Sequence, residues 1–138
     1  MIMKFDDRQL LASIEDDADF AEWYVEDFMR NHLQNYYFEI SDSGKREMTL
    51  QGREYARSFG FGDPRAQAHF VTLMWQIGPN FFTFPGFRDI VRDPRLGDLD
   101  KIDAIYKVPQ EQAVVAIMNP DDRYWYPYML GTTGGGNG

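Results

Sequence analysis

The sequence predicts an all-α, single-domain protein, an orthogonal bundle of about six to seven helices around a buried central helix at residues 64–77. The first observation is the central helix itself, which carries apolar side chains on nearly every face and is therefore expected in the core. Asp63 and Pro64 begin it, as N-cap and first helical residue, and Gly78 with Pro79 ends it. The second observation is that several other segments repeat apolar residues at helical spacing and are joined by short connections.

The first forty residues predict two helices. Residues 5–14 form a short helix, and Asp16 or Asp17 then caps a longer helix that continues to about residue 40. On one face of this long helix, acidic residues recur at three- and four-residue spacing. If the helix is continuous, they form a ridge of carboxylates: Glu15, Asp19, Glu22 and Glu26.

The middle of the chain predicts a loop at residues 41–45 and a third helix at residues 47–59. Gly52 falls in the apolar face of that third helix. Two interpretations remain open: the glycine permits close approach of a neighbouring helix, or it is incidental near a helix start.

Downstream of the central helix, residues 80–87 predict a buried connector rich in Phe and Pro, and three more helices follow. Pro85 opens the first, Asp98 caps the second and Pro109 begins the third. The apolar run at residues 113–118 falls in the third helix, although an edge strand is the alternative.

The C-terminal part differs in composition from the rest. Residues 123–130 are an aromatic segment that either folds back on the bundle or offers an apolar surface, and residues 131–138 have the composition of a flexible, Gly-rich tail. The expected organisation is one helical domain over residues 1–130 and this tail.

Composition narrows the compartment and the partner. The chain of 138 residues has no cysteine, no apolar run of transmembrane length and no predicted signal peptide, so a cytoplasmic protein is expected. Its net charge of −8 is concentrated in residues 1–28, which hold nine acidic and two basic residues. Nucleic acid and anionic membranes are disfavoured as partners because both require a basic surface. A basic protein partner is compatible with this asymmetry, and a solvated acidic helix face is the simpler alternative.

The sequence contains no recognisable catalytic chemistry. Nucleophile-elbow, phosphate-loop and dinucleotide motifs are absent, and no metal or cofactor is expected. His32 and His69 are interpreted as core or boundary histidines, since neither has a Glu three residues before it.

Four stretches, at residues 55–61, 69–81, 90–94 and 101–103, together resemble a group of small helical proteins encoded beside type VI secretion and polymorphic-toxin genes in Gram-negative bacteria. The resemblance covers roughly residues 48–106 and consists of helix-packing residues. It implies a cytoplasmic accessory protein, either an immunity protein that binds a cognate toxin or an adaptor that loads an effector.

The first functional hypothesis is therefore a non-enzymatic protein-binding module of such a toxin system. The acidic helix face would dock on a basic partner and aromatic side chains would anchor the contact. The oligomeric state stays open. The candidate partner-binding residues are Asp16, Asp19, Glu22, Trp23, Glu26, Trp125 and Tyr126, with Tyr24 as a further aromatic anchor.

Two alternatives belong to other classes. One is an enzyme that uses carboxylates, with or without a metal, because any two of the 22 acidic residues can meet in space. The other is a structural component of a secretion or phage particle.

Overall fold

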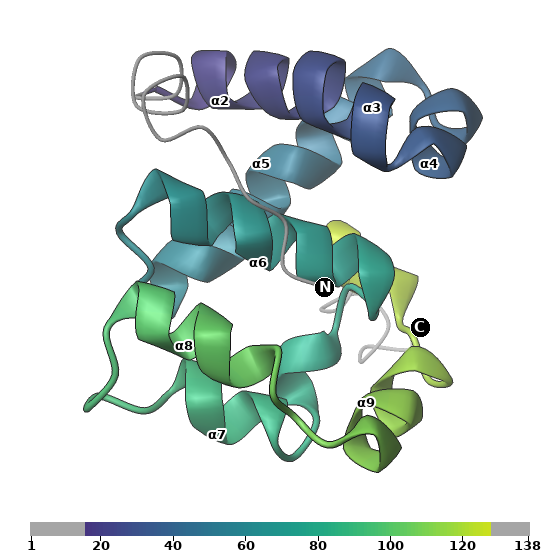
Figure 1. The fold of residues 1–138 in the computed structure, drawn as a ribbon. Helices are drawn as coiled ribbons and strands as arrows, with labels where there is room; N and C mark the ends of the chain where they lie inside the picture. Colours follow the sequence, from purple (N-terminus) through teal and green to yellow (C-terminus); the bar gives the residue numbers. More distant parts are fainter. Residues whose placement is uncertain (1–15, 128–138) are drawn as a thin grey trace, which may run out of the picture.

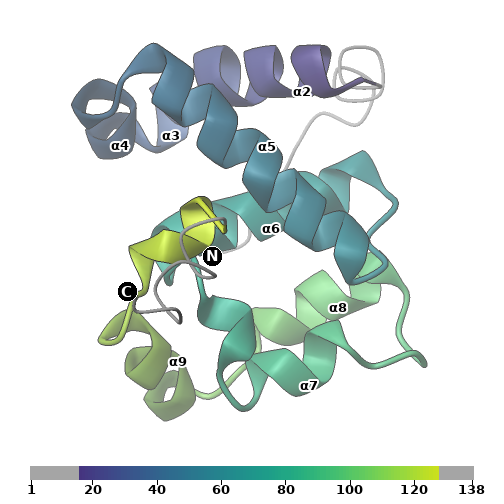
Figure 2. The same cartoon turned by 180° about the vertical axis from the view of Figure 1, so that it is seen from behind.

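The computed structural model describes residues 16–127, and all regular structure in that part of the chain is helical. The all-α fold with a packed core is thus confirmed. The predicted helix at residues 5–14 and the tail at residues 131–138 lie outside the described residues. Figures 1 and 2 show three levels: α2, α3 and α4 at the top, α6 across the middle, and α7 and α8 below, with α5 crossing diagonally between the upper levels.

The central helix is α6, Pro64–Gln76, and its two predicted boundary signals are confirmed. The Asp63 side chain accepts a hydrogen bond from the backbone N–H of Arg65 at 2.8 Å, and Pro64 occupies the first turn. Every residue from Ala66 to Trp75 is buried. The helix is therefore enclosed on nearly all sides, as its apolar circumference predicts.

The prediction of one continuous helix to about residue 40 is wrong. Four segments follow one another instead: α2 (Asp17–Trp23), the π-helix η1 (Tyr24–Met29), α3 (Arg30–His32) and α4 (Gln34–Glu39). The wider π turn lets Tyr24, Val25, Phe28 and Met29 all face the core. At Leu33 the backbone leaves the helical region (φ −130°, ψ 52°), and α4 begins in a new direction.

A tertiary contact accounts for the direction of α4. The Tyr36 hydroxyl donates to the backbone oxygen of Trp75 at 3.0 Å, and the two rings lie 5.0 Å apart. This contact joins α4 to the end of α6, and no local sequence pattern indicates it.

The predicted loop at residues 41–45 is also wrong, because α5 extends over Asp42–Ser58. Ser41 caps this helix by accepting a hydrogen bond from the backbone N–H of Gly44 at 3.1 Å.

Of the two interpretations of Gly52, close approach is confirmed. A Cβ at this position would lie 2.9 Å from Val71 Cγ2 and 3.1 Å from Met74 Sδ, so α5 and α6 approach each other closely here.

After α6 the chain passes through the 3-10 turn η2 (Phe81–Thr83), α7 (Phe87–Val91), α8 (Asp98–Ile105) and α9 (Gln110–Ile117). The connector after α6 is buried as expected, with Phe81 and Phe82 in the core. Helix α7 starts two residues later than predicted, after Gly86 at φ +93°. Asp98 is the first residue of α8 and not its N-cap, and its carboxylate accepts from the backbone N–H of Asp63 at 2.7 Å.

Residues 113–117 are helical, so the edge-strand alternative is wrong. In α9 only Ala116 is buried, and the larger side chains of this helix point to solvent.

The last described element is the 3-10 turn η3 (Asp122–Trp125), which folds back against the end of α6. Asn80 fixes this return: its amide donates to the backbone oxygen of Asn119 at 3.2 Å, and its side-chain oxygen accepts from the backbone N–H of Asp121 at 3.0 Å. Arg123 then donates to both carboxylate oxygens of Asp121, at 2.9 and 2.7 Å. Of the two alternatives for the aromatic segment, its residues 123–127 therefore fold back on the bundle.

Candidate partner-binding surface

The acidic residues at the start of α2 are held by hydrogen bonds and ion pairs within the domain. Asp16 is the N-cap of α2, where it accepts from the backbone N–H of Asp19 at 2.8 Å. Asp17 accepts from Arg53 and from Arg57, each at 3.0 Å. Asp19 itself is exposed. The predicted Glu15 lies outside the described residues.

Two glutamates of the predicted ridge, Glu22 and Glu26, contact a single arginine. Arg46, on α5, contacts Glu22 at 2.9 Å and Glu26 at 3.1 Å, and it also contacts Asp42 at 3.3 Å. Three carboxylates around one guanidinium leave the cluster with two net negative charges. The structure therefore brings Glu22 and Glu26 together, but it neutralises part of the charge that the sequence places there.

Trp23 and Tyr24 lie in the core. Trp23 is 8 % exposed and Tyr24 is fully enclosed, with its hydroxyl 2.7 Å from Thr72 Oγ1. Burial raises the pKa of Tyr24 well above its ordinary value. Neither aromatic ring presents a face to a partner, so both are removed from the anchor candidates.

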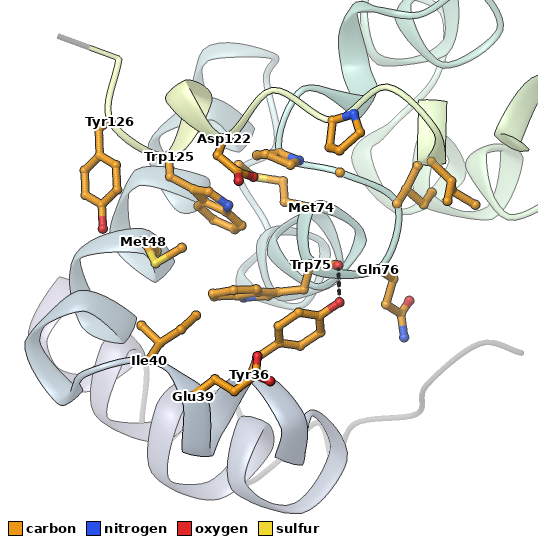
Figure 3. A pocket seen from close by; sticks show the side chains of 15 residues that line it. Tyr36, Glu39, Ile40, Met48, Met74, Trp75, Gln76, Asp122, Trp125 and Tyr126 are labelled. Carbon is orange, nitrogen blue, oxygen red and sulfur yellow. Dashed lines mark hydrogen bonds between the residues drawn. The ribbon is translucent and has the colours of Figure 1, made fainter. Parts of the chain in front are cut away.

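Trp125 and Tyr126 line a groove of about 570 Å³ on the side of the molecule between α4 and α9 (Figures 1 and 3). Trp125 is largely buried and its ring centroid lies 4.5 Å from that of Trp75. Tyr126 is half-buried at the edge. We call this feature the aromatic groove, and its lining includes Tyr36, Glu39, Ile40, Met48, Trp75, Ile117, Pro120, Asp122, Trp125 and Tyr126.

The groove combines apolar walls with two acidic side chains. Glu39 comes from α4 and Asp122 from η3, and both residues are exposed. Within residues 16–127, neither carboxylate forms an ion pair, and no Lys, Arg or His lines the groove. The volume is that of a site for one large side chain or a small ligand.

The wall also contains a donor without an acceptor. In the described part of the chain, Trp75 Nε1 is the only buried side-chain nitrogen or oxygen atom that lacks a hydrogen-bond partner. Leaving such a donor unsatisfied costs about 1–3 kcal/mol. This N–H is itself enclosed by the protein, so it is not open to an occupant of the groove.

Next to the groove, α9 exposes a row of large apolar side chains. Met118, the C-cap residue, is 71 % exposed, and the others are each between 43 and 51 % exposed. Small Ala116 packs inward on the opposite side, beside Gly78. Ile117 belongs to both features, since it also lines the groove. We call this row the α9 apolar face, and it consists of Val114, Val115, Ile117 and Met118.

The two histidines lie in different surroundings. His69 is buried in α6, with Nδ1 3.1 Å from the Tyr106 hydroxyl, and burial lowers its pKa to about 4. His32 is exposed and lies against the Phe28 ring, with centroids 5.0 Å apart. Over residues 16–127 no group of three His, Asp or Glu side chains is arranged to hold a metal ion.

Of the residues that form the aromatic groove and the α9 apolar face, the sequence analysis names only Trp125 and Tyr126 as candidates for partner binding. Helical periodicity places Tyr36 in the buried stripe of a continuous helix and Trp75 in a core helix, and it does not indicate which side of α9 faces solvent. The detectable signal was the composition of α9, whose small residues, Ala113 and Ala116, share a side that permits close packing.

No match was found when the chain was compared with models of protein families, with curated proteins and with solved structures. Among the described helices, none has the length and apolar character that crossing a membrane requires.

Proposed function

We propose that this chain is a non-enzymatic protein-binding module, an immunity or effector-adaptor protein of a bacterial type VI secretion or toxin system. It acts in the cytoplasm and binds a basic partner protein. The observation that carries the proposal is the α9 apolar face and its continuity with the aromatic groove through Ile117. The resemblance at residues 48–106 supports the assignment to a toxin system.

The α9 apolar face supports binding because its arrangement is unfavourable in the isolated protein. A surface helix normally turns its large apolar residues inward, whereas α9 packs through Ala116 and exposes Val115 and Met118. Contiguous apolar patches of this kind are typical of interaction sites. Methionine and aromatic side chains are also enriched at the centres of protein interfaces.

The charge of the chain supports a basic partner. The net charge of −8, with acidic residues concentrated before residue 29, gives the chain a negative field. Part of that field survives internal pairing, since the cluster around Arg46 keeps two net negative charges. Such a field accelerates encounter with a basic protein and makes the association rate fall as salt rises. Asp16, Asp19, Glu22 and Glu26 thus serve in steering, and the groove supplies the contact.

Co-expression with the products of the flanking genes tests the proposal. One flanking gene is expected to arrest growth of a laboratory bacterial host when expressed alone, and the chain is expected to restore growth and co-elute with the product. A flanking product that binds the chain without being toxic supports the adaptor role. Failure of every flanking product to bind would contradict both roles.

A further inference from the structure

We infer that the aromatic groove binds an arginine side chain, presented by a helical segment of the partner whose neighbouring apolar residues lie on the α9 apolar face. This inference rests on the proposed function, since it names the chemistry of the surface through which the module acts.

The shape of the groove suits a long side chain with an apolar stem and a polar end. Its volume of about 570 Å³ is lined by four aromatic residues, Tyr36, Trp75, Trp125 and Tyr126 (Figure 3). Trp75 packs against Tyr36 and Trp125, with ring centroids 5.0 and 4.5 Å apart, so an occupant lies beside these three rings and not between them. Such walls cover the methylene groups of arginine. Aromatic faces also attract a cation that approaches them.

The charges of the groove select a cation. Glu39 and Asp122 reach it from opposite sides, from α4 and from η3, and neither forms an ion pair within residues 16–127. With no basic residue in the lining, an anionic side chain meets only repulsion. The carboxylates therefore lack a counter-charge that an incoming basic side chain supplies.

Arginine fits better than lysine for two reasons. A planar guanidinium stacks on aromatic rings and donates along its edge to carboxylates at the same time, whereas an ammonium group is a strongly hydrated point charge. The guanidinium is also less costly to remove from water, which matters in a groove walled by Trp75 and Trp125.

The flanking surface determines the kind of segment that carries the arginine. Ile117 lies in the groove wall, and Val114 and Met118 extend the apolar surface along α9. A helix that places apolar residues three and four positions from an arginine covers both features at once.

Designed peptides test this assignment without knowledge of the natural partner. The probes are three 14-residue helical peptides of leucine and alanine that differ at one central position: arginine, its neutral isostere citrulline, or lysine. Binding is followed by the indole N–H signals of the 15N-labelled chain. The signals of Trp75 and Trp125 report on the groove, and Trp23, in the core among Phe20 and Tyr24, is the internal control.

The arginine peptide is expected to shift the Trp75 and Trp125 signals saturably while Trp23 stays unchanged, and to bind at least fivefold more tightly than either other peptide. In the double variant Glu39→Gln, Asp122→Asn, this advantage is expected to disappear. The matched double variant Glu47→Gln, Asp100→Asn changes the net charge equally at exposed positions outside the groove and is expected to keep the advantage.

Equal binding of the arginine and citrulline peptides would overturn the inference, and equal binding of the arginine and lysine peptides would overturn its choice of arginine. A dimer of the free chain whose interface covers Met118 would also overturn it, since a second copy would then be the occupant. If the peptides bind equally but a flanking gene product binds the chain, the inference about arginine fails and the proposed function is supported. If the arginine peptide binds selectively but no flanking gene product binds the chain, the proposed function fails and the inference about the groove is supported.

Discussion

Replacing Gly52 with valine is expected to lower the free energy of unfolding by about 2–3 kcal/mol, because the added side chain enters a helix contact that has no room for it. Even a Cβ alone would lie 2.9 Å from Val71 Cγ2 and 3.1 Å from Met74 Sδ. Both neighbours are buried in α6, and the β-branched valine cannot rotate away easily. Urea unfolding followed by far-UV circular dichroism measures the loss.

The matched control is Gly62→Val, at an exposed glycine with no atom within 4 Å of its added Cβ, and it is expected to change stability by less than about 0.5 kcal/mol. A double-mutant cycle with Val71→Ala locates the effect. Removing the valine methyl groups is expected to make the Gly52→Val change at least about 1 kcal/mol less costly. Additive effects would show that α5 and α6 do not meet as described.

Acidification is expected to remove about 2–3 kcal/mol of stability between pH 6.5 and pH 4, because His69 resists protonation in the folded state. Burial lowers its pKa from 6.5 to about 4. Between these two values the unfolded chain binds a proton that the folded chain does not, so this contribution is complete above pH 6.5 and is lost as the pH falls to 4. The free energy of unfolding, measured in urea at several pH values, checks this.

In the variant His69→Gln, the free energy of unfolding is expected to change less between pH 6.5 and pH 4 than in the wild type. Glutamine keeps a polar group near the Tyr106 hydroxyl but does not titrate. His32→Gln, at an exposed position, is the control, and the fall in stability is expected to persist in it. A variant at His69 that loses stability as steeply as the wild type would refute the assignment.

The parts of the fold that local sequence predicted are those determined by local interactions. Asp63 and Pro64 begin α6 through their own capping and backbone geometry. Gly52 was informative because a glycine within an apolar helical face leaves space that a neighbouring helix can fill. The break at Leu33 was not predictable in this way, since it accompanies a contact between Tyr36 and Trp75, 39 residues apart.

In the candidate site, too, the sequence predicts features that depend on local interactions and not those that depend on tertiary contacts. Periodicity indicates which side of a helix is apolar, but it does not say whether that side faces the domain or the solvent. In α9 the large residues point outward because Ala116 packs against the chain near Gly78. Likewise, the sequence showed the acidic residues of α2 but not that Arg46, some twenty residues later, pairs with Glu22 and Glu26.

The most direct test of the central claim is the dissociation constant of the partner, obtained from the flanking-gene experiment, for a chain with Val115→Ser and Met118→Ser. Calorimetry is expected to show binding at least tenfold weaker than for the wild type, a loss of about 1.4 kcal/mol or more. Phe38→Ser is the control, because Phe38 is 75 % exposed on α4 and is not part of the surface. Unchanged affinity of the folded double variant would contradict the claim that the module binds through the α9 apolar face.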